Sequence, residues 1–252
     1  MPPDPSCFTG LNLPQSFTFP TTMEDFTLSA GPNTDLWRKP PNGDTSTAPI
    51  IFTSLQRRFV VAEVTISADW EMESDQGGLV IFAGPVPTQS IPSDTASRYR
   101  SSLGSAPTCK WVKAGMEFAS GTVNASSVTA TPDGADWCGF PLALPNRHTN
   151  ILSLRIKLER VGHALWIWYQ VPSLAPHAHT PGAVGSTWKK LREVTWFFYG
   201  VEDKCVHVGV YASRPTNLSR TDTMWQAMHG LRIDDSTRGN ELVVNFEDLE
   251  IF

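Results

Sequence analysis

The stretch 111–118, WVKAGMEF, alternates between two kinds of residue with a period of two. In an extended strand, successive side chains point to opposite faces. One face of this strand would be apolar and would carry Val112, Ala114, Met116 and Phe118. The other would carry Trp111, Lys113, Gly115 and Glu117. Such a strand could be half buried and half solvated, or its second face could form one wall of a binding cleft.

The same alternation, or a run of β-branched residues, recurs in short segments along the chain. The 20 prolines and 18 glycines separate these segments from one another. The predicted strands are 47–55, 59–68, 78–83, 111–118, 126–131, 151–159, 164–171, 193–199, 206–212 and 242–252. The segments 151–159 and 164–171 are predicted to pair as a hairpin. Residues 224–231 are the one short helix that the pattern predicts.

Many short strands without a sustained helical period predict an all-β fold, a two-sheet antiparallel sandwich. The sequence shows no internal repeat and no linker, so one domain is predicted over 1–252, with 1–25 as an N-terminal extension. Two long segments interrupt the strands, at 85–107, which is rich in Ser, Pro and Thr, and at 172–185. Loops of this length are often functional.

Several strands repeat the two-faced pattern, and their second faces carry unusual residues. Arg155 lies on the polar side of 151–159, Trp166 and Trp168 on one side of 164–171, and His207 and Tyr211 on one side of 206–213. The solvated face of an antiparallel sheet predicts Lys, Thr, Ser and Glu, not indoles. If these strands share a sheet, the pattern favours a ligand surface. The alternative is a second small core beneath the long loops.

Composition and charge narrow the classes of partner. The net charge of −5 and a pI near 5.7 argue against binding of nucleic acid. No apolar run reaches 18 residues, so no transmembrane helix is expected. The N-terminus, MPPDPSCFTG, lacks the features of a secretory signal, and a cytoplasmic location is predicted. The four cysteines have no CxxC spacing, so free thiols are expected rather than disulfides or zinc ligands.

Motifs for standard catalysis are weak or missing. Glu71, Glu73 and Asp75 alternate as the acids of retaining glucanases do, but they precede Gly77-Gly78 in a turn, which favours a solvated loop over glycoside hydrolysis. His177 and His179 lack a third ligand, and no metal and no cofactor are expected. No phosphate loop, GxSxG or HExxH occurs. His207 is either a general acid or base, or a satisfied polar residue.

Six stretches, in order, carry a resemblance to a known family. They are 35–41 (DLWRKPP), 75–79 (DQGGL), 111–117 (WVKAGME), 127–129 (SVT) with 136–137 (DW), 208–215 (VGVYASRP) and 244–249 (VNFEDL). Together they resemble the regulation-of-enolase protein family. The resemblance implies a concanavalin A-like jelly roll with long loops over its concave face. It also draws Gln76 and Thr129 into the predicted site.

A looser resemblance, to fungal hetero-Diels–Alderases, ranks the functional hypotheses. It implies a cofactor-independent cyclase that joins a quinone methide to a terpene, two partners held face to face. In this hypothesis the substrate is a small apolar or aromatic molecule, Lys113, His207 and Glu117 are the catalytic groups, and the substrate-binding residues are Trp111, Arg155, Trp166, Trp168, Tyr211, Gln76 and Thr129. The alternative is a non-catalytic lectin-like module for carbohydrate or protein. Oligomeric state has no signal in the sequence.

Overall fold

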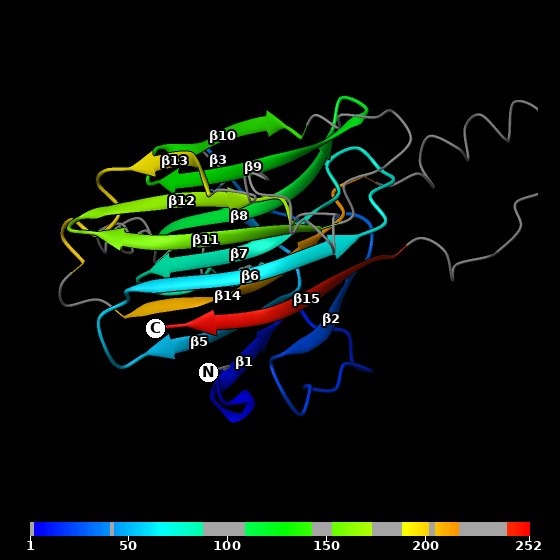
Figure 1. Cartoon of the computed structure of the whole chain (residues 1–252), viewed down its shortest axis with the longest axis horizontal. Coiled ribbons are helices and arrows are strands. Elements are labelled where there is room, and N and C mark those ends of the chain that lie inside the picture. The colour runs from blue at the N-terminus through cyan, green and yellow to red at the C-terminus, as the bar shows by residue number, and fades with distance from the viewer. Residues whose placement is uncertain are drawn as a thin grey trace, which may run out of the picture.

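The computed structural model describes residues 3–40, 43–87, 109–142, 153–172, 188–201, 205–216 and 241–252. Two large antiparallel sheets stack on each other and form a β-sandwich (Figure 1). The seven-stranded sheet has the order β1-β5-β14-β7-β8-β9-β10, and the six-stranded sheet has the order β13-β12-β11-β6-β15-β2. The predicted all-β, two-sheet antiparallel sandwich is therefore confirmed.

The seven-stranded sheet brings together segments that lie far apart in sequence. Its strands, in spatial order, are β1 (Phe8–Leu11), β5 (Ile50–Leu55), β14 (Val206–Ser213), β7 (Gln76–Ala83), β8 (Lys110–Ala119), β9 (Thr122–Thr131) and β10 (Gly134–Pro141). The stretch WVKAGMEF is therefore the middle of β8, between β7 and β9. The edge strand β1 falls within the predicted N-terminal extension and pairs with β5.

The six-stranded sheet is the second layer of the sandwich. Its strands, in spatial order, are β13 (Lys189–Val194), β12 (Ala164–Gln170), β11 (Ser153–Val161), β6 (Val61–Ala68), β15 (Leu242–Ile251) and β2 (Asp25–Ala30). The predicted hairpin is confirmed, since β11 pairs with β12 in register from Arg155↔Gln170 to Val161↔Ala164.

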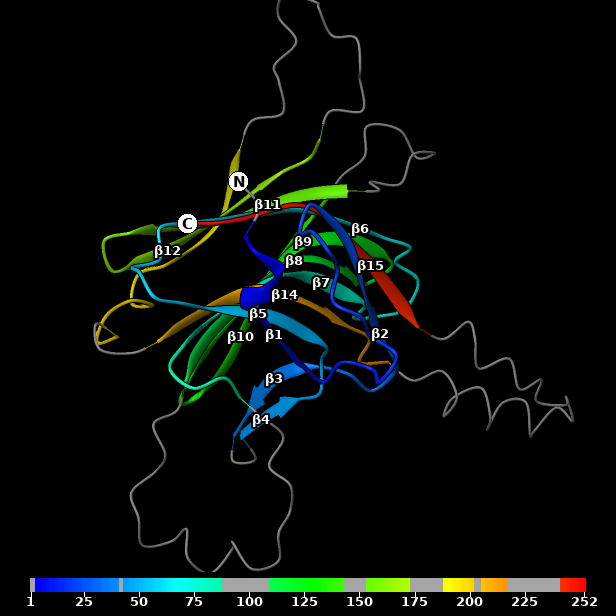
Figure 2. The same ribbon diagram turned by 90° about the horizontal axis from the view of Figure 1, so that it is seen from below.

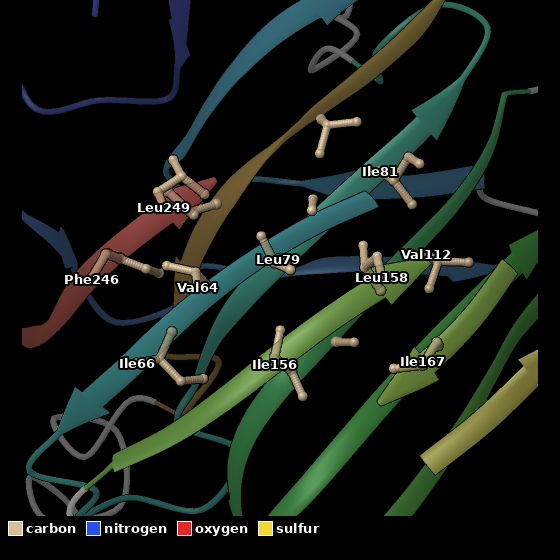
Figure 3. Close-up of a cluster of buried hydrophobic side chains, with 14 of the residues drawn as sticks. Val64, Ile66, Leu79, Ile81, Val112, Ile156, Leu158, Ile167, Phe246 and Leu249 are labelled. Carbon is tan, nitrogen blue, oxygen red and sulfur yellow. The ribbon is translucent and has the colours of Figure 1, made fainter. Parts of the chain in front are cut away.

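The main core lies between the two sheets. Figure 3 shows Leu79, Ile81 and Val112 of the seven-stranded sheet facing Val64, Ile66, Ile156 and Leu158 of the six-stranded sheet. All of these side chains are fully buried. Burial of each such aliphatic side chain contributes roughly 1.5–3 kcal/mol, which makes this layer the principal source of stability.

A third, two-stranded sheet lies on the far side of the seven-stranded sheet. It consists of β3 (Leu36–Lys39) and β4 (Gly43–Ser46), and Figure 2 shows it beneath β7, β8 and β14, on the side away from β6 and β11. We call this side of the seven-stranded sheet its outer face. Between the hairpin and the outer face lies a second core, whose buried members include Leu36, Val80, Phe82, Trp111 and Tyr211.

Some strands were not predicted from the sequence. These are β1, β2, β3, β4 and β10. β10 is an edge strand with mostly exposed or half-buried residues, so it lacks the alternation that identifies a strand. The predicted strand 193–199 is wrong in its second half: β13 ends at Val194, and residues 195–200 form turns in which Phe197 and Phe198 pack into the core. The predicted helix 224–231 lies outside the described residues.

Candidate functional site

A pocket of about 330 Å³ opens on the outer face of the seven-stranded sheet, beside β3. Strands β7, β8, β9 and β10 form its base and one side, and the loop before β7 closes another side. Its polar and aromatic lining consists of Asp35, Trp37, Glu73, Ser74, Gln76, Lys113, Glu117 and Trp137. Three of the residues predicted from sequence, Gln76, Lys113 and Glu117, are thus brought together.

Lys113 is the buried cation of this pocket, with a side chain that is only 1% exposed. Its Nζ lies 3.1 Å from Asp35 Oδ1 and 5.5 Å from the centre of the Tyr211 ring. Burial lowers the pKa of Lys113, and the negative charges of Asp35 and Glu117 offset part of that effect. An ammonium group with a lowered pKa is a better proton donor than an ordinary lysine.

Asp35 reaches Lys113 because the base of the β3–β4 hairpin holds it. Its backbone nitrogen donates to Thr47 Oγ1 at 2.8 Å, and its carbonyl accepts from the backbone nitrogens of Thr47 at 2.8 Å and Ala48 at 3.1 Å. The carboxylate itself is 25% exposed, so solvent reaches one side of the ion pair. The hairpin therefore positions the charged partner of a lysine that belongs to a different sheet.

Trp137 forms the rim of the pocket and is 43% exposed. Its Nε1 donates to Glu117 Oε2 at 2.6 Å, so the indole is held in one orientation while part of it stays exposed to solvent. The neighbouring Gly139 makes this possible: a Cβ at that position would lie 2.3 Å from Trp137 Cζ2. The absence of a side chain at residue 139 is thus a steric requirement for the position of the indole.

Replacing Gly139 with Ala is expected to displace the Trp137 ring and weaken its bond to Glu117, with a loss of about 1 kcal/mol in the free energy of unfolding. The measurement is the indole N–H NMR spectrum, in which Trp137→Phe identifies the relevant signal. That signal should shift in Gly139→Ala. Gly31→Ala is the control, because nothing lies within 4 Å of a Cβ there. An unshifted Trp137 signal in Gly139→Ala would contradict this account.

Gln76 lines the pocket, whereas Tyr211 belongs to the second core beside Lys113 and does not line the pocket. The Tyr211 hydroxyl is 3.5 Å from Gln76 Oε1, and Gln76 Nε2 donates to the carbonyl of Ser74 at 3.2 Å. Burial raises the pKa of Tyr211 well above its ordinary value, and Glu117 and Asp35 add to the shift. Tyr211 therefore stays protonated, and its 1% exposure makes it a support for Lys113 rather than a ligand contact.

Asp75 corrects the prediction that residues 71–75 are a solvated acidic loop. Glu71 and Glu73 are exposed, but Asp75 is fully buried and forms a two-bonded ion pair with Arg214, with both N–O distances at 2.8 Å. Asp75 also accepts from the backbone nitrogen of Met72 at 2.9 Å. The ion pair fastens the loop before β7 to the end of β14, next to the pocket wall. The three acids therefore do not share a face as glucanase acids would.

The other residues predicted on the same sheet lie outside the pocket. Trp111 is fully buried under the β3–β4 hairpin, where Arg38 lies over its ring and Asp44 accepts from its Nε1 at 3.4 Å. His207 points to the outer face, but it bonds Ser54 at 2.8 Å and packs on Phe52, away from the pocket lining. Its pKa is lowered by partial burial.

Thr129 lies on the opposite face from Lys113. Cross-strand pairing places Val112 beside Thr129 and Lys113 beside Val128, and Val112 belongs to the core between the sheets. Because side chains alternate along a strand, Thr129 points into the sandwich interior. The structure therefore does not place Thr129 in the pocket, because neighbouring residues of a strand point to opposite faces of the sheet.

The two-faced strands do not all share one sheet, so the condition on which a common ligand surface depended is not met. Arg155, Trp166 and Trp168 belong to β11 and β12 of the six-stranded sheet. There Arg155 pairs with Glu63 at 3.2 Å, and Lys190 Nζ lies 3.4 Å from the centre of the Trp166 ring. The two indoles and Lys190 pack against one another on the second layer. The sandwich separates them, and Arg155, from Lys113.

Sequence reasoning missed Asp35, Trp37 and Trp137 as site residues. Asp35 and Trp37 lie in the stretch 35–41, and Trp137 in 136–137; the family resemblance is the one signal that these stretches carry in the sequence. Glu73 had been discounted with the acidic loop. Here its carboxylate accepts from the backbone nitrogen of Ser120 with both oxygens, each at 3.0 Å.

In the described parts of the chain, no group of three or more His, Cys, Asp or Glu residues is placed to hold a metal ion. All four cysteines are free, as expected. The described residues contain no helix that is long and apolar enough to cross a membrane.

Comparison with known proteins identifies relatives of this chain. A family described as "Protein of unknown function (DUF1349)" matches residues 11–251. The uncharacterized protein AN7484 of Emericella nidulans is 31% identical over 228 residues, which cover 90% of this chain and 86% of the relative. The family match therefore spans the pocket residues and the strands of both large sheets, apart from the first three residues of β1.

Solved structures resemble this one in fold. A functionally unknown protein from Saccharomyces cerevisiae superposes with a TM-score of 0.62 at 18% identity, over 99% of this chain and 98% of that one. The GH43 protein BlXynB from Bacillus licheniformis superposes with a TM-score of 0.51 at 10% identity, over 90% of this chain and 32% of that one. At these identities the likeness concerns the fold alone.

Proposed function

This chain belongs to the DUF1349 family of proteins of unknown function, and from that premise we propose that its outer-face pocket binds a small polyhydroxylated ligand of the carbohydrate type. The observation that carries the proposal is the pocket wall. Two indoles, Trp37 and Trp137, stand beside the carboxylates and amide of Glu117, Glu73 and Gln76. Apolar ring faces with a few fixed polar groups are typical of small-molecule sites.

The polarity of the wall indicates the class of ligand. Three carboxylates, those of Asp35, Glu73 and Glu117, face one ammonium group with a lowered pKa. This balance does not suit an anion. Hydroxyl groups both donate and accept, so they can bond carboxylates, the Gln76 amide and Lys113 together. A neutral or amino-bearing polyol therefore fits the lining better than a purely hydrocarbon surface does.

The size of the pocket supports a single-ring ligand. Its volume of about 330 Å³ lies at the low end of the range of roughly 300–1,000 Å³ for small-molecule sites. The Trp137 side chain is 43% exposed, and the orientation of its indole is fixed by the Glu117 bond. A sugar ring can stack its apolar face on that indole while its hydroxyls reach Glu117.

Trp137→Ala is the direct test of this proposal. Ligand affinity is expected to fall about tenfold or more, because both the stacking surface and the orienting bond to Glu117 are lost. The measurement is a glycan-array screen of the wild type, followed by calorimetry with the best ligand. Phe140→Ala is the control, since Phe140 is a neighbouring exposed aromatic residue of β10 that does not line the pocket. Equal affinity in Trp137→Ala and the wild type would remove the pocket from consideration.

A second candidate is the cofactor-independent cyclase suggested by the looser resemblance. One observation supports it: Lys113 is buried, and its lowered pKa suits donation of a proton or hydrogen bond to a carbonyl as charge develops. A pericyclic reaction and a cytoplasmic location both stay predictions. Turnover of a quinone methide and a terpene by the wild type, lost in Lys113→Met, would support the cyclase.

A further inference from the structure

A second pocket, of about 450 Å³, lies at one end of the sandwich where two turns meet. One turn connects β5 to β6 and carries Arg57 and Arg58. The other connects β11 to β12 and carries His163, next to Arg160. Leu55 and Phe59 form part of the apolar wall. This pocket shares no residue with the outer-face pocket.

The charge of this pocket contrasts with that of the chain. Three arginines and a histidine line it, and none of its described lining residues is acidic, although the chain as a whole carries a net charge of −5. Arg57 and Arg58 are exposed, and within the described part of the chain neither forms an ion pair. Residues 202–204, next to the lining residue Val201, lie outside the described residues.

The third arginine is held in place by its neighbours. The guanidinium of Arg160 lies 4.2 Å from the centre of the Phe198 ring, and its Nε donates to the carbonyl of Gly162 at 3.0 Å. The backbone nitrogen of Arg160 donates to the carbonyl of Val60 at 2.8 Å, which ties the two turns together. The three positive charges are therefore brought to one hollow by the fold itself.

We propose that this pocket binds a phosphate monoester. Guanidinium groups match the geometry of phosphate oxygens and bond them in pairs. Like charges gathered in one hollow repel each other, and a dianion relieves that repulsion. The apolar residues Leu55, Phe59, Val201 and Val206 line the rest of the pocket, so a phosphate attached to a small apolar group fits better than inorganic phosphate. This assignment is independent of the function of the outer-face pocket.

The test uses phenyl phosphate and inorganic phosphate as probes, with binding to the full chain measured by calorimetry at low salt. Phenyl phosphate is expected to bind more tightly than inorganic phosphate. Its affinity should fall at least about tenfold in the double variant Arg57→Gln/Arg58→Gln, because charge-assisted hydrogen bonds are lost. Both arginines are exposed on a turn, so the variant is expected to fold. Lys189→Gln is the control, since it removes an exposed charge that is not in the pocket.

A lipid headgroup could present the same chemistry, so a second arm uses vesicles of phosphatidylcholine with and without phosphatidic acid. Co-sedimentation that requires phosphatidic acid and is lost in Arg57→Gln/Arg58→Gln supports the proposal with a lipid as source. Binding of phenyl phosphate without co-sedimentation supports it with a free phosphate ester as source. The proposal is overturned if neither probe binds, or if the double variant binds them as the wild type does.

Discussion

Replacing Arg214 with Met is expected to lower the free energy of unfolding by about 3–5 kcal/mol, because it leaves a carboxylate buried without its partner. Asp75 is fully buried, and both of its bonds to Arg214 are 2.8 Å long. Chemical denaturation, with the midpoint and slope both compared with the wild type, measures the loss. A loss below 1 kcal/mol would show that Asp75 is solvated after all.

Two further variants separate the ion pair from the space it fills. Arg214→Met combined with Asp75→Leu removes both charges, and we expect it to recover part of the loss, since an apolar pair of similar volume is often as stable as a buried ion pair. Recovery will be incomplete because Asp75 also accepts from the Met72 nitrogen. Arg155→Met is the matched control: its partner Glu63 lies at 3.2 Å in a partly exposed pair, which is worth less than about 1 kcal/mol.

Lys113→Met is expected to remove ligand binding at the outer-face pocket while leaving the fold intact. Met fills nearly the same space without a charge, and the former partner Asp35 is 25% exposed and keeps contact with water. Stability near neutral pH should therefore stay within about 1 kcal/mol of the wild type. Lys113→Ala should be less stable than the Met variant by about 2–3 kcal/mol, because it leaves a cavity. Lys189→Met is the surface control.

The pH dependence of stability gives Lys113 a signature of its own. Burial lowers its pKa in the folded state below the ordinary value of 10.5. At pH values between the folded-state pKa and 10.5, Lys113 keeps its proton in the unfolded chain but loses it in the folded chain. The free energy of unfolding therefore rises with pH in this range. Lys113→Met should lack this rise. Equal pH profiles for the two proteins would mean that Lys113 is not desolvated.

Tyr211 has the opposite effect on the pH dependence of stability, so its contribution must be separated from that of Lys113. Its raised pKa keeps the folded chain protonated where the unfolded chain loses its proton, so its effect lowers stability above about pH 10. Both the wild type and Lys113→Met contain Tyr211, and the difference between them isolates the lysine. The comparison is best made below about pH 10, before unfolded tyrosine titrates.

The strands were predictable where the alternation was strong. WVKAGMEF reads as a strand from local pattern alone, and its two faces were assigned correctly: Val112 and Met116 lie in the main core, and Lys113 and Glu117 in the pocket. Weak or exposed strands such as β10 lack that signal. Short strands such as β3 and β4 have too few residues to show a period.

The partners of these strands were not predictable from periodicity. Alternation assigns a residue to a face of its own strand, but it does not say which sheet the strand joins. The strands containing Trp166 and His207 show the same two-faced pattern, yet β12 and β14 belong to different layers. Asp35 and Lys113 are 78 residues apart along the chain. They meet only because the β3–β4 hairpin folds over the outer face of the seven-stranded sheet (Figure 2).

The amino-acid sequence by itself determined that this chain folds as an antiparallel β-sandwich, because hydrophobic periodicity is a local property that each strand carries. Tertiary structure alone decided which polar faces meet. Strand order places Trp111 in a second core, Trp166 on the other layer and Trp137 at the rim of the pocket. Contacts of this kind depend on long-range pairing and on loop closure, which no short stretch of sequence encodes.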